Sequence, residues 1–364
     1  MSLKTLLPQI LTSPGLRGLS RAMRAAGRRL SGAKPRLHAF LEPGEPYSEL
    51  LRFAAPRLAE RYGFELVCHA VAPPERAAAP EPERLADFSR SDADFLAAHY
   101  GLEGDPPLPE PSGDPDEGAR LRRKWGHYSS GMLYFEGEWY WGLDRIHHLE
   151  RRRGAREEDL LFPPPAEAET APPGGRIEVF FSLRSPYSYL AAMRMFDRAR
   201  AWGAEIVVRP VLPMVMRSLP VPPAKRFYIV RDCKREAERL GLPFGKIVDP
   251  VGAGVERGLA VFFYADRAGK GEAFLTRFMS GVWSQGLDAA SDRDLFRIAH
   301  EAGLEPETVR AALSDQSWRD EVEANREALF EAGLWGVPCF RVGEKITFGQ
   351  DRLWRVGRWL NGLD

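Results

Sequence analysis

The second half of the chain alternates apolar and polar residues with the periods of a strand, a helix and a second strand. Residues 177–181 form an apolar run, Pro186 opens a segment with helical spacing, and residues 205–211 are again rich in β-branched residues. A strand that returns parallel to its predecessor through a helix is a βαβ unit. The pattern therefore predicts an α/β domain that begins at about residue 176.

A hairpin and a last helix are predicted near the C-terminus. Residues 339–342 and 345–348 flank Gly343-Glu344, and a helical pattern starts at Asp351. Between residues 214 and 333 the pattern is helical throughout, with glycines after two of the runs and serine caps before two others. The predicted helices cover residues 224–240, 255–268, 274–284, 292–302 and 318–332. The second domain thus carries an all-helical insertion between its two halves.

The first half of the chain repeats the second. Residues 36–73 match residues 176–213 at a constant offset of 140, with Pro46, Tyr47 and Ser48 identical to their partners. The closing motifs match at an offset of 207, so the second copy has 67 extra residues. Two thioredoxin-like domains in tandem fit this pattern, because each copy joins a βαβ half to a ββα half. The predicted divisions are a basic arm (1–35), a first domain (36–150), a Pro-rich linker (151–175) and a second domain (176–364).

Composition narrows the possible functions. The 51 basic and 51 acidic residues balance, so no global field attracts nucleic acid, and no apolar run is long enough for an integral membrane segment. The arm is an exception, because it is rich in arginine and has no acid before Glu42. It is either an interfacial or organelle-targeting amphipathic segment or a flexible or packed terminus. A cytoplasmic protein is expected, with an organelle as the alternative.

Cysteine and histidine spacing predicts neither disulfides nor a metal site. Cys68, Cys233 and Cys339 are far apart in the sequence, which excludes a Cys-x-x-Cys pair. His147 and His148 are adjacent and would point about 100° apart on a helix. We therefore expect these histidines on the surface and no bound metal.

Ser185 is the most informative candidate for chemistry. It precedes Pro186 at the start of a predicted helix, where its side chain would cap the helix at the positive end of the dipole. Capping alone is one interpretation. The other is that Ser185 and Ser188 occupy the i and i+3 positions at which thioredoxin-like oxidoreductases carry two cysteines, so that an external thiol supplies the sulfur.

The motif Phe180-Phe-x-x-x-Ser185-Pro-Tyr-Ser188 resembles the opening of 2-hydroxychromene-2-carboxylate isomerases and kappa-class glutathione transferases, a DsbA-like group. Three further segments agree, and the resemblance covers residues 176–364. They are Pro223-x-Lys225-x-x-Tyr228, Val282-Trp-Ser284, and Gly336-Val-Pro338 with Gly349-Gln-Asp-Arg352.

This resemblance implies a glutathione-dependent isomerase or transferase that acts on a small aromatic electrophile. Ser185 would donate to the glutathione sulfur, and Val337 would pair its backbone with the cysteinyl part beside a cis Pro338. Gln350 and Asp351 would hold the γ-glutamyl end, and Lys225 would meet the glycyl carboxylate. The assembly would be a homodimer or an intrachain pseudo-dimer.

Two rival functions stay open. One is a thiol-disulfide oxidoreductase that uses Cys339, and the other is a non-catalytic scaffold in which the first copy occludes the site. The segment between Arg209 and Lys225 is short for the family, and Ser182 stands where aspartate is common. The first copy has Glu45 at the position of Ser185 and, by the sequence match, Met132 at that of Pro338. It is therefore predicted to be degenerate and non-catalytic.

Overall fold

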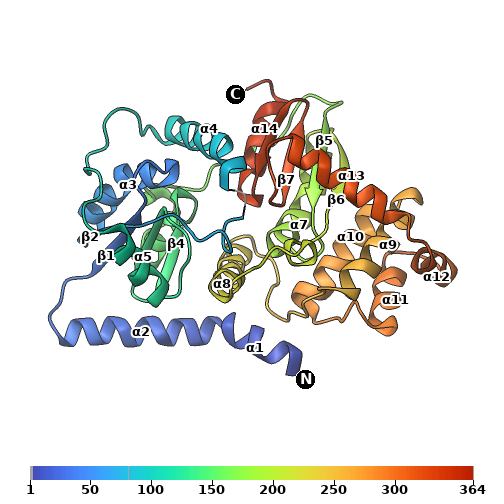
Figure 1. Ribbon diagram of the computed structural model, residues 1–364, viewed down its shortest axis with the longest axis horizontal. Coiled ribbons are helices and arrows are strands. Elements are labelled where there is room, and N and C mark those ends of the chain that lie inside the picture. Colours follow the sequence, from blue (N-terminus) through green and yellow to red (C-terminus); the bar gives the residue numbers. More distant parts are fainter. Residues whose placement is uncertain (1–2, 81, 364) are drawn as a thin grey trace. The chain divides into compact units, whose positions relative to one another are not determined.

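Two four-stranded sheets organise the chain, one in each half (Figure 1). The structure is a computed structural model that describes residues 3–80 and 82–363. The N-terminal unit comprises residues 14–165 together with residues 220–228. The C-terminal unit comprises the described residues up to 13, residues 166–219 and residues 229 onward.

The N-terminal unit has the strand order β2-β1-β3-β4, with β1 parallel to β2 and antiparallel to β3. Helix α3 joins β1 to β2, and the β3–β4 hairpin closes the sheet. Its helices and strands are α2 (Pro14–Leu30), β1 (Arg36–Leu41), α3 (Pro46–Tyr62), β2 (Glu65–Ala70), α4 (Pro82–Tyr100), α5 (Pro115–Lys124), β3 (Met132–Phe135), β4 (Glu138–Trp141) and α6 (Ile146–Arg152).

The C-terminal unit has the equivalent order β6-β5-β7-β8, with the same parallel and antiparallel pairings. Helix α8 begins in the segment that groups with the N-terminal unit. The elements are α1 (Leu3–Leu11), β5 (Arg176–Phe181), α7 (Pro186–Ala201), β6 (Glu205–Pro210), α8 (Pro223–Arg239), α9 (Ala253–Arg267), α10 (Gly271–Ser280), α11 (Asp292–Glu301), α12 (Pro306–Ser314), α13 (Trp318–Glu331), β7 (Cys339–Val342), β8 (Lys345–Phe348) and α14 (Leu353–Leu360). The predicted α/β class is confirmed.

The two sheets share their register as well as their order. Arg36 faces Glu65 in one sheet, and Arg176 faces Glu205 in the other. The amide of Gly142 donates to the carbonyl of Gly131 at 2.9 Å, just as that of Gly349 donates to Pro338 at 2.9 Å. The hydrogen bonds thus follow the offsets of 140 and 207 that the sequence displays.

Side-chain contacts extend this correspondence into the helices. The hydroxyl of Tyr47 donates to Asp92 on α4, and that of Tyr187 donates to Asp232 on α8, again 140 residues apart. On α13, the Asn325 amide donates to the carbonyl of Pro210 at 3.1 Å. At the matching place on α5 stands Gly118, where a side chain would collide with the carbonyl oxygen of Ala70.

The insertion expected over residues 214–333 stays a prediction, and the contacts of α8 and α13 described above favour narrower bounds. Between these two helices lie α9 to α12. They build an apolar core with α7 that includes Phe262, Phe274 and Phe278, each at most 1% exposed.

Several local expectations were wrong. Helix α12 was missing from the prediction, whereas the helix expected over residues 274–284 is present as α10 and a π-helical turn at Gly281–Gln285. Ser317 does not cap α13, because its hydroxyl donates to Asp315 at 2.9 Å. His147 is not on the surface, being 2% exposed on α6. Part of the expected linker is packed, since Phe162 is 1% exposed.

Within the described residues, none of the helices is both long enough and apolar enough to cross a lipid bilayer.

Candidate active site around Ser185

Ser185 stands where the C-terminal end of β5 passes into α7. Its backbone is extended, with φ −89° and ψ 118°, and its Oγ accepts a hydrogen bond from the amide of Ser188 at 3.1 Å. Pro186 occupies the first helical turn, where its fixed φ suits the helix and its missing N–H costs nothing. The predicted cap is confirmed, and the hydroxyl lies at the positive end of the α7 dipole.

The loop before β7 lies against this hydroxyl. Ser185 Oγ is 3.4 Å from the carbonyl oxygen of Val337, and the Val337–Pro338 peptide bond is cis, as expected. A hydroxyl bond of that length is weak, because O–H···O bonds normally measure about 2.5 to 3.0 Å. Ser185 therefore uses its lone pair for the cap and keeps a proton that a better acceptor could take.

Aromatic side chains from α7 and the inserted region pack together in the core of the C-terminal unit and form a buried apolar wall. The Tyr189 hydroxyl donates to the carbonyl of Pro243, and the rings of Phe244 and Trp283 are stacked 6.1 Å apart. Burial raises the pKa of Tyr189 to about 12. This phenol is therefore a neutral donor and part of an apolar wall at neutral pH.

Arg184 ties the Ser185 loop to the same region. Its guanidinium donates to both carboxylate oxygens of Asp249, at 2.8 and 2.7 Å. The bidentate geometry fixes the loop beside residues 243–249. Neither this pair nor the aromatic wall was predicted, because the sequence places their members about 60 residues apart and no motif links them.

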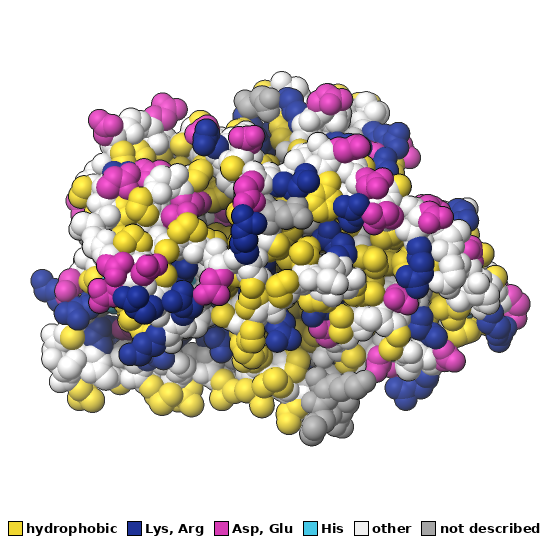
Figure 2. Space-filling view, viewed as in Figure 1, with side chains coloured by type: hydrophobic (Ala, Val, Ile, Leu, Met, Phe, Trp, Pro, Cys, Tyr) yellow, Lys and Arg dark blue, Asp and Glu magenta, His cyan; other side chains and the backbone are white. Residues whose placement is uncertain are grey.

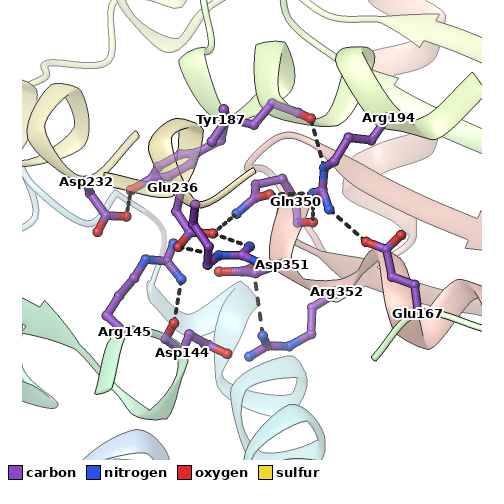
Figure 3. A network of polar contacts seen from close by, with 12 residues as sticks. Asp144, Arg145, Glu167, Tyr187, Arg194, Asp232, Glu236, Gln350, Asp351 and Arg352 are labelled. Atoms are coloured by element: carbon purple, nitrogen blue, oxygen red, sulfur yellow. Dashed lines mark hydrogen bonds and ion pairs between the residues drawn. The ribbon is translucent and has the colours of Figure 1, made fainter. Parts of the chain in front are cut away.

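A buried carboxylate anchors the first turn of α7 to α8. The hydroxyl of Tyr187 donates to Asp232 at 2.8 Å, and Arg235 donates to the second oxygen of that carboxylate, also at 2.8 Å. Asp232 is fully buried, and Figure 3 shows its carboxylate directed at Tyr187. The position of Ser185 thus depends on contacts one helical turn away.

Arg194 on α7 organises a second network, in which Gln350 takes part. Arg194 donates to the side-chain oxygen of Gln350 at 2.6 Å and to Glu167 at 2.7 Å (Figure 3). The Gln350 amide donates in turn to Glu236 at 3.2 Å. Gln350 is 1% exposed, so both ends of its side chain have protein partners.

The remaining expected ligands of glutathione lie in different surroundings. Asp351 is beside Gln350 with its side chain 22% exposed, in the same unit as Ser185. Lys225 groups with the N-terminal unit, where its Nζ donates to the carbonyl of Ala78 at 2.7 Å and lies 5.7 Å from the ring of Tyr128. Burial lowers the pKa of Lys225 to about 8. The structure therefore groups Ser185, Val337, Pro338 and the Gln350 segment, and places Lys225 in the other unit.

Cys339 follows the cis proline and packs inward. Its side chain is fully buried, and its Sγ donates to the carbonyl of Gly336 at 3.0 Å. Burial raises the pKa of this thiol well above its usual range. A thiol in this state is a poor nucleophile, because the thiolate is the reactive form.

We expect iodoacetamide at about pH 8 to leave Cys339 unmodified in the folded protein while it slowly modifies Cys68, which is only half-buried. Mass spectrometry of tryptic peptides measures both, and unfolding in urea should make the two thiols equally reactive. Rapid labelling of native Cys339 would contradict this expectation and favour the oxidoreductase alternative.

The equivalent position in the N-terminal unit holds a carboxylate. Glu45 caps α3, accepting from the amides of Tyr47 and Ser48 at 3.1 and 2.7 Å, and burial raises its pKa. Met132 pairs with Phe40 in one sheet as Cys339 pairs with Phe180 in the other, so Met132 is equivalent to Cys339 and Gly131 is equivalent to Pro338. The expected match of Met132 with Pro338 was one residue out of register.

A separate cavity of about 570 Å³ opens at the other end of β5. It is lined by Arg176, Glu178, Arg341 and Glu344, among others. Glu178 is paired there with Arg209 and Arg341, whose guanidinium groups hold the pKa of its carboxyl below the usual range against the opposing effect of burial. This cavity does not include the Ser185 loop.

Comparisons with known proteins agree with the C-terminal geometry. Residues 176–358 match the family model described as a DSBA-like thioredoxin domain. The 2-hydroxychromene-2-carboxylate isomerase of Sphingobium xenophagum is 25% identical over 185 residues, which cover 49% of this chain and 93% of the relative. The isomerase of the same name from Pseudomonas putida is 24% identical over 188 residues, covering 50% and 91%.

Two solved structures match about half of this chain at lower sequence identity. A 2-hydroxychromene-2-carboxylate isomerase structure matches 51% of this chain and 94% of its own, with 21% identity and a TM-score of 0.45. The cytosolic disulfide reductase DsbM from Pseudomonas aeruginosa, solved with GSH, matches 50% and 96%, with 18% identity and a TM-score of 0.38.

Proposed function

The chain belongs to the DSBA-like thioredoxin domain family through residues 176–358, and from this premise we propose that it is a glutathione-dependent isomerase of a small aromatic electrophile. The observation that carries the proposal is the hydroxyl of Ser185 at the N-terminus of α7, 3.4 Å from the carbonyl of Val337 beside the cis Pro338. A family site for sulfur chemistry without its own cysteine needs a thiol from outside. The names of the curated relatives support isomerisation as the reaction.

Ser185 and the α7 N-terminus can together hold a thiol as its thiolate. Lowering a thiol pKa from about 8.5 to about 6.5 requires about 2.7 kcal/mol in favour of the charged form. A helix N-terminus supplies about 0.3 to 2 kcal/mol, and a hydrogen bond to a charged atom supplies about 1.5 to 3 kcal/mol. The helix N-terminus alone falls short of the requirement, and the two effects together supply about 1.8 to 5 kcal/mol, a range that includes it. The Ser185 hydroxyl, which donates only weakly to the Val337 carbonyl at 3.4 Å, is the donor that this requires.

The residues present fit the thiol end of glutathione better than its other ends. Ser185 offers a hydroxyl, and the backbone of Val337 offers polar groups next to it. Asp351 is partly exposed and can accept an ammonium group. Gln350 has partners for both ends of its amide, so we assign it the role of holding the Asp351 segment in place. Lys225 donates one of its three ammonium protons to Ala78 within the N-terminal unit, and its contact with the glycyl carboxylate stays a prediction from the resemblance.

Glutathione, when bound, supplies a sulfur nucleophile that can add reversibly to an unsaturated carbon and thereby allow rotation about a double bond. This chain's residues have three tasks in that chemistry. Ser185 donates its proton toward the sulfur, the Val337 loop orients the thiol, and the buried rings of Tyr189, Phe244 and Trp283 pack in the core with α7 and hold that helix in place. Retention of the sulfur on the product would be the transferase alternative.

The N-terminal unit is proposed to be a degenerate thioredoxin-like copy without catalytic function. The shared strand order, register and Tyr–Asp contacts support a common origin of the two units. Glu45 replaces the serine, and a carboxylate at a helix N-terminus would repel a thiolate. One active site per chain follows. The three free cysteines accord with a reducing compartment such as the cytoplasm.

The proposal is tested by following the conversion of 2-hydroxychromene-2-carboxylate into its ring-opened trans isomer by ultraviolet absorbance at increasing glutathione concentrations. We expect a rate that rises with glutathione in the low millimolar range and is absent with S-methylglutathione, which has no thiol. Mass spectrometry of the product separates an isomer from a conjugate. A rate independent of glutathione would exclude the proposed mechanism.

A further inference from the structure

Helix α2 packs on the N-terminal unit with its charged side turned inward. Arg21 donates to both carboxylate oxygens of Glu138 at 2.6 and 2.7 Å, and Arg28 donates to Glu136 at 2.6 Å. The two glutamates flank the turn between β3 and β4, and none of these four side chains is more than 31% exposed. Two ion pairs therefore fix the rotation of α2 about its own axis.

The opposite side of α2 is apolar and open to solvent. None of the helix residues is buried, and Figure 2 shows hydrophobic side chains along the lower edge of the view, where α2 runs. Spacings of three, four and seven residues place the large ones on one stripe. They are Leu16, Leu19, Met23 and Leu30, with exposed fractions of 50%, 57%, 61% and 89%.

The charge of α2 favours one kind of occupant for this stripe. The helix carries five arginines and no acidic residue. A second copy of the chain would bring like charges together. It would also bury little, because a stripe about 25 Å long and 10 Å wide gives about 500 Å² in a pair, well below the 1,200 Å² or so of a stable interface. An anionic lipid layer fits both features, because its phosphate groups pair with arginines and its acyl chains bury the leucine side chains.

We infer that α2 is a docking helix for an anionic membrane surface. It lies in the plane of the interface, with Leu16, Leu19 and Met23 at the boundary of the acyl chains. Arg29, which is exposed, borders the stripe and contacts lipid phosphates, whereas the Arg24 guanidinium lies against Gly137 in the β3–β4 turn. The Arg21 and Arg28 ion pairs hold the helix in this orientation before it meets the lipid.

Flotation of the full chain with lipid vesicles tests the inference. At about 0.1 M salt, vesicles with about one quarter phosphatidylglycerol should bind the protein about tenfold more tightly than vesicles of phosphatidylcholine alone. About 1 M salt should weaken that preference by screening. The variant Leu16→Ser/Leu19→Ser/Met23→Ser should bind the anionic vesicles about tenfold less tightly. Its circular dichroism should be unchanged, because all three side chains are exposed.

A matched control removes the same number of exposed apolar side chains elsewhere. Leu161→Ser/Val251→Ser/Leu363→Ser changes residues that are 39%, 45% and 51% exposed, and should bind like the wild type. Replacing Arg29 by glutamine should weaken the preference for anionic lipid. Equal loss in the control, or no binding by the wild type, would overturn the inference. So would light scattering that shows a dimer which the α2 variant dissociates.

Discussion

Replacing Ser185 by alanine is expected to lower kcat/KM for the glutathione-dependent reaction by about 10- to 100-fold, which corresponds to the loss of a hydrogen bond to a charged sulfur. The pKa of the bound thiol should rise by about one to two units, so the pH–rate profile should move to higher pH. Stopped-flow absorbance between about pH 6 and pH 9 measures both effects. The variant should also lose about 1 kcal/mol of stability, because Oγ caps α7.

The control for that second effect is Ser291→Ala. Ser291 caps α11 through the amide of Asp294 at 3.3 Å and has no part in the proposed chemistry. It should show the same loss of stability with unchanged kinetics, whereas Ser185→Thr should retain most of the activity. If Ser185→Ala matched the wild type at all pH values, Ser185 would be a helix cap and nothing more.

Replacing Arg194 by methionine is expected to destabilise the C-terminal unit by about 3 kcal/mol. The change removes the donor to the buried Gln350 side chain and one of the partners of Glu167. The carboxylate of Glu236, which is as buried as Gln350, then accepts from an amide that is held less firmly. Urea unfolding followed by tryptophan fluorescence measures the loss. Because Gln350 holds the segment that contains Asp351, the apparent KM for glutathione should also rise.

Arg200→Met on the same helix is the comparison. Arg200 pairs with Glu272 and Asp197, but its side chain is 59% exposed, so solvent screens both pairs and the free energy of unfolding should hardly change. A similar loss of stability in both variants would show that the Arg194 network contributes no more than a surface ion pair.

The sequence predicted the parts of the site that depend on local structure. The helix start at Ser185-Pro186 is a matter of capping and backbone preference, and it is confirmed. The hairpin at Gly343-Glu344 was found for the same reason. The expectation for His147 failed because burial depends on what packs against a helix, which the local pattern does not contain.

The repeat was visible in the sequence but its extent was not. Asp92 and Asp232 lie beyond the segments that match in sequence, and a single identity there carries little signal. The structure makes the equivalence visible, because each carboxylate accepts a hydrogen bond from a tyrosine. The equivalence of Gly131 and Pro338 likewise became visible only from the register of the strands in the two sheets. A shift of one residue reverses the face of a strand and is hard to detect across a gap.

By itself the sequence determined the α/β class, the two similar halves, the family resemblance and Ser185 as the candidate residue, because periodicity, capping and ordered motifs are local properties of the chain. Only the tertiary structure decided that the hydroxyl meets the Val337 carbonyl, that the side chain of Gln350 has partners of its own, and that the apolar stripe of α2 faces solvent. Each of these depends on contacts between residues more than a hundred positions apart or on the rotation of a helix against its sheet, and a linear pattern does not record them.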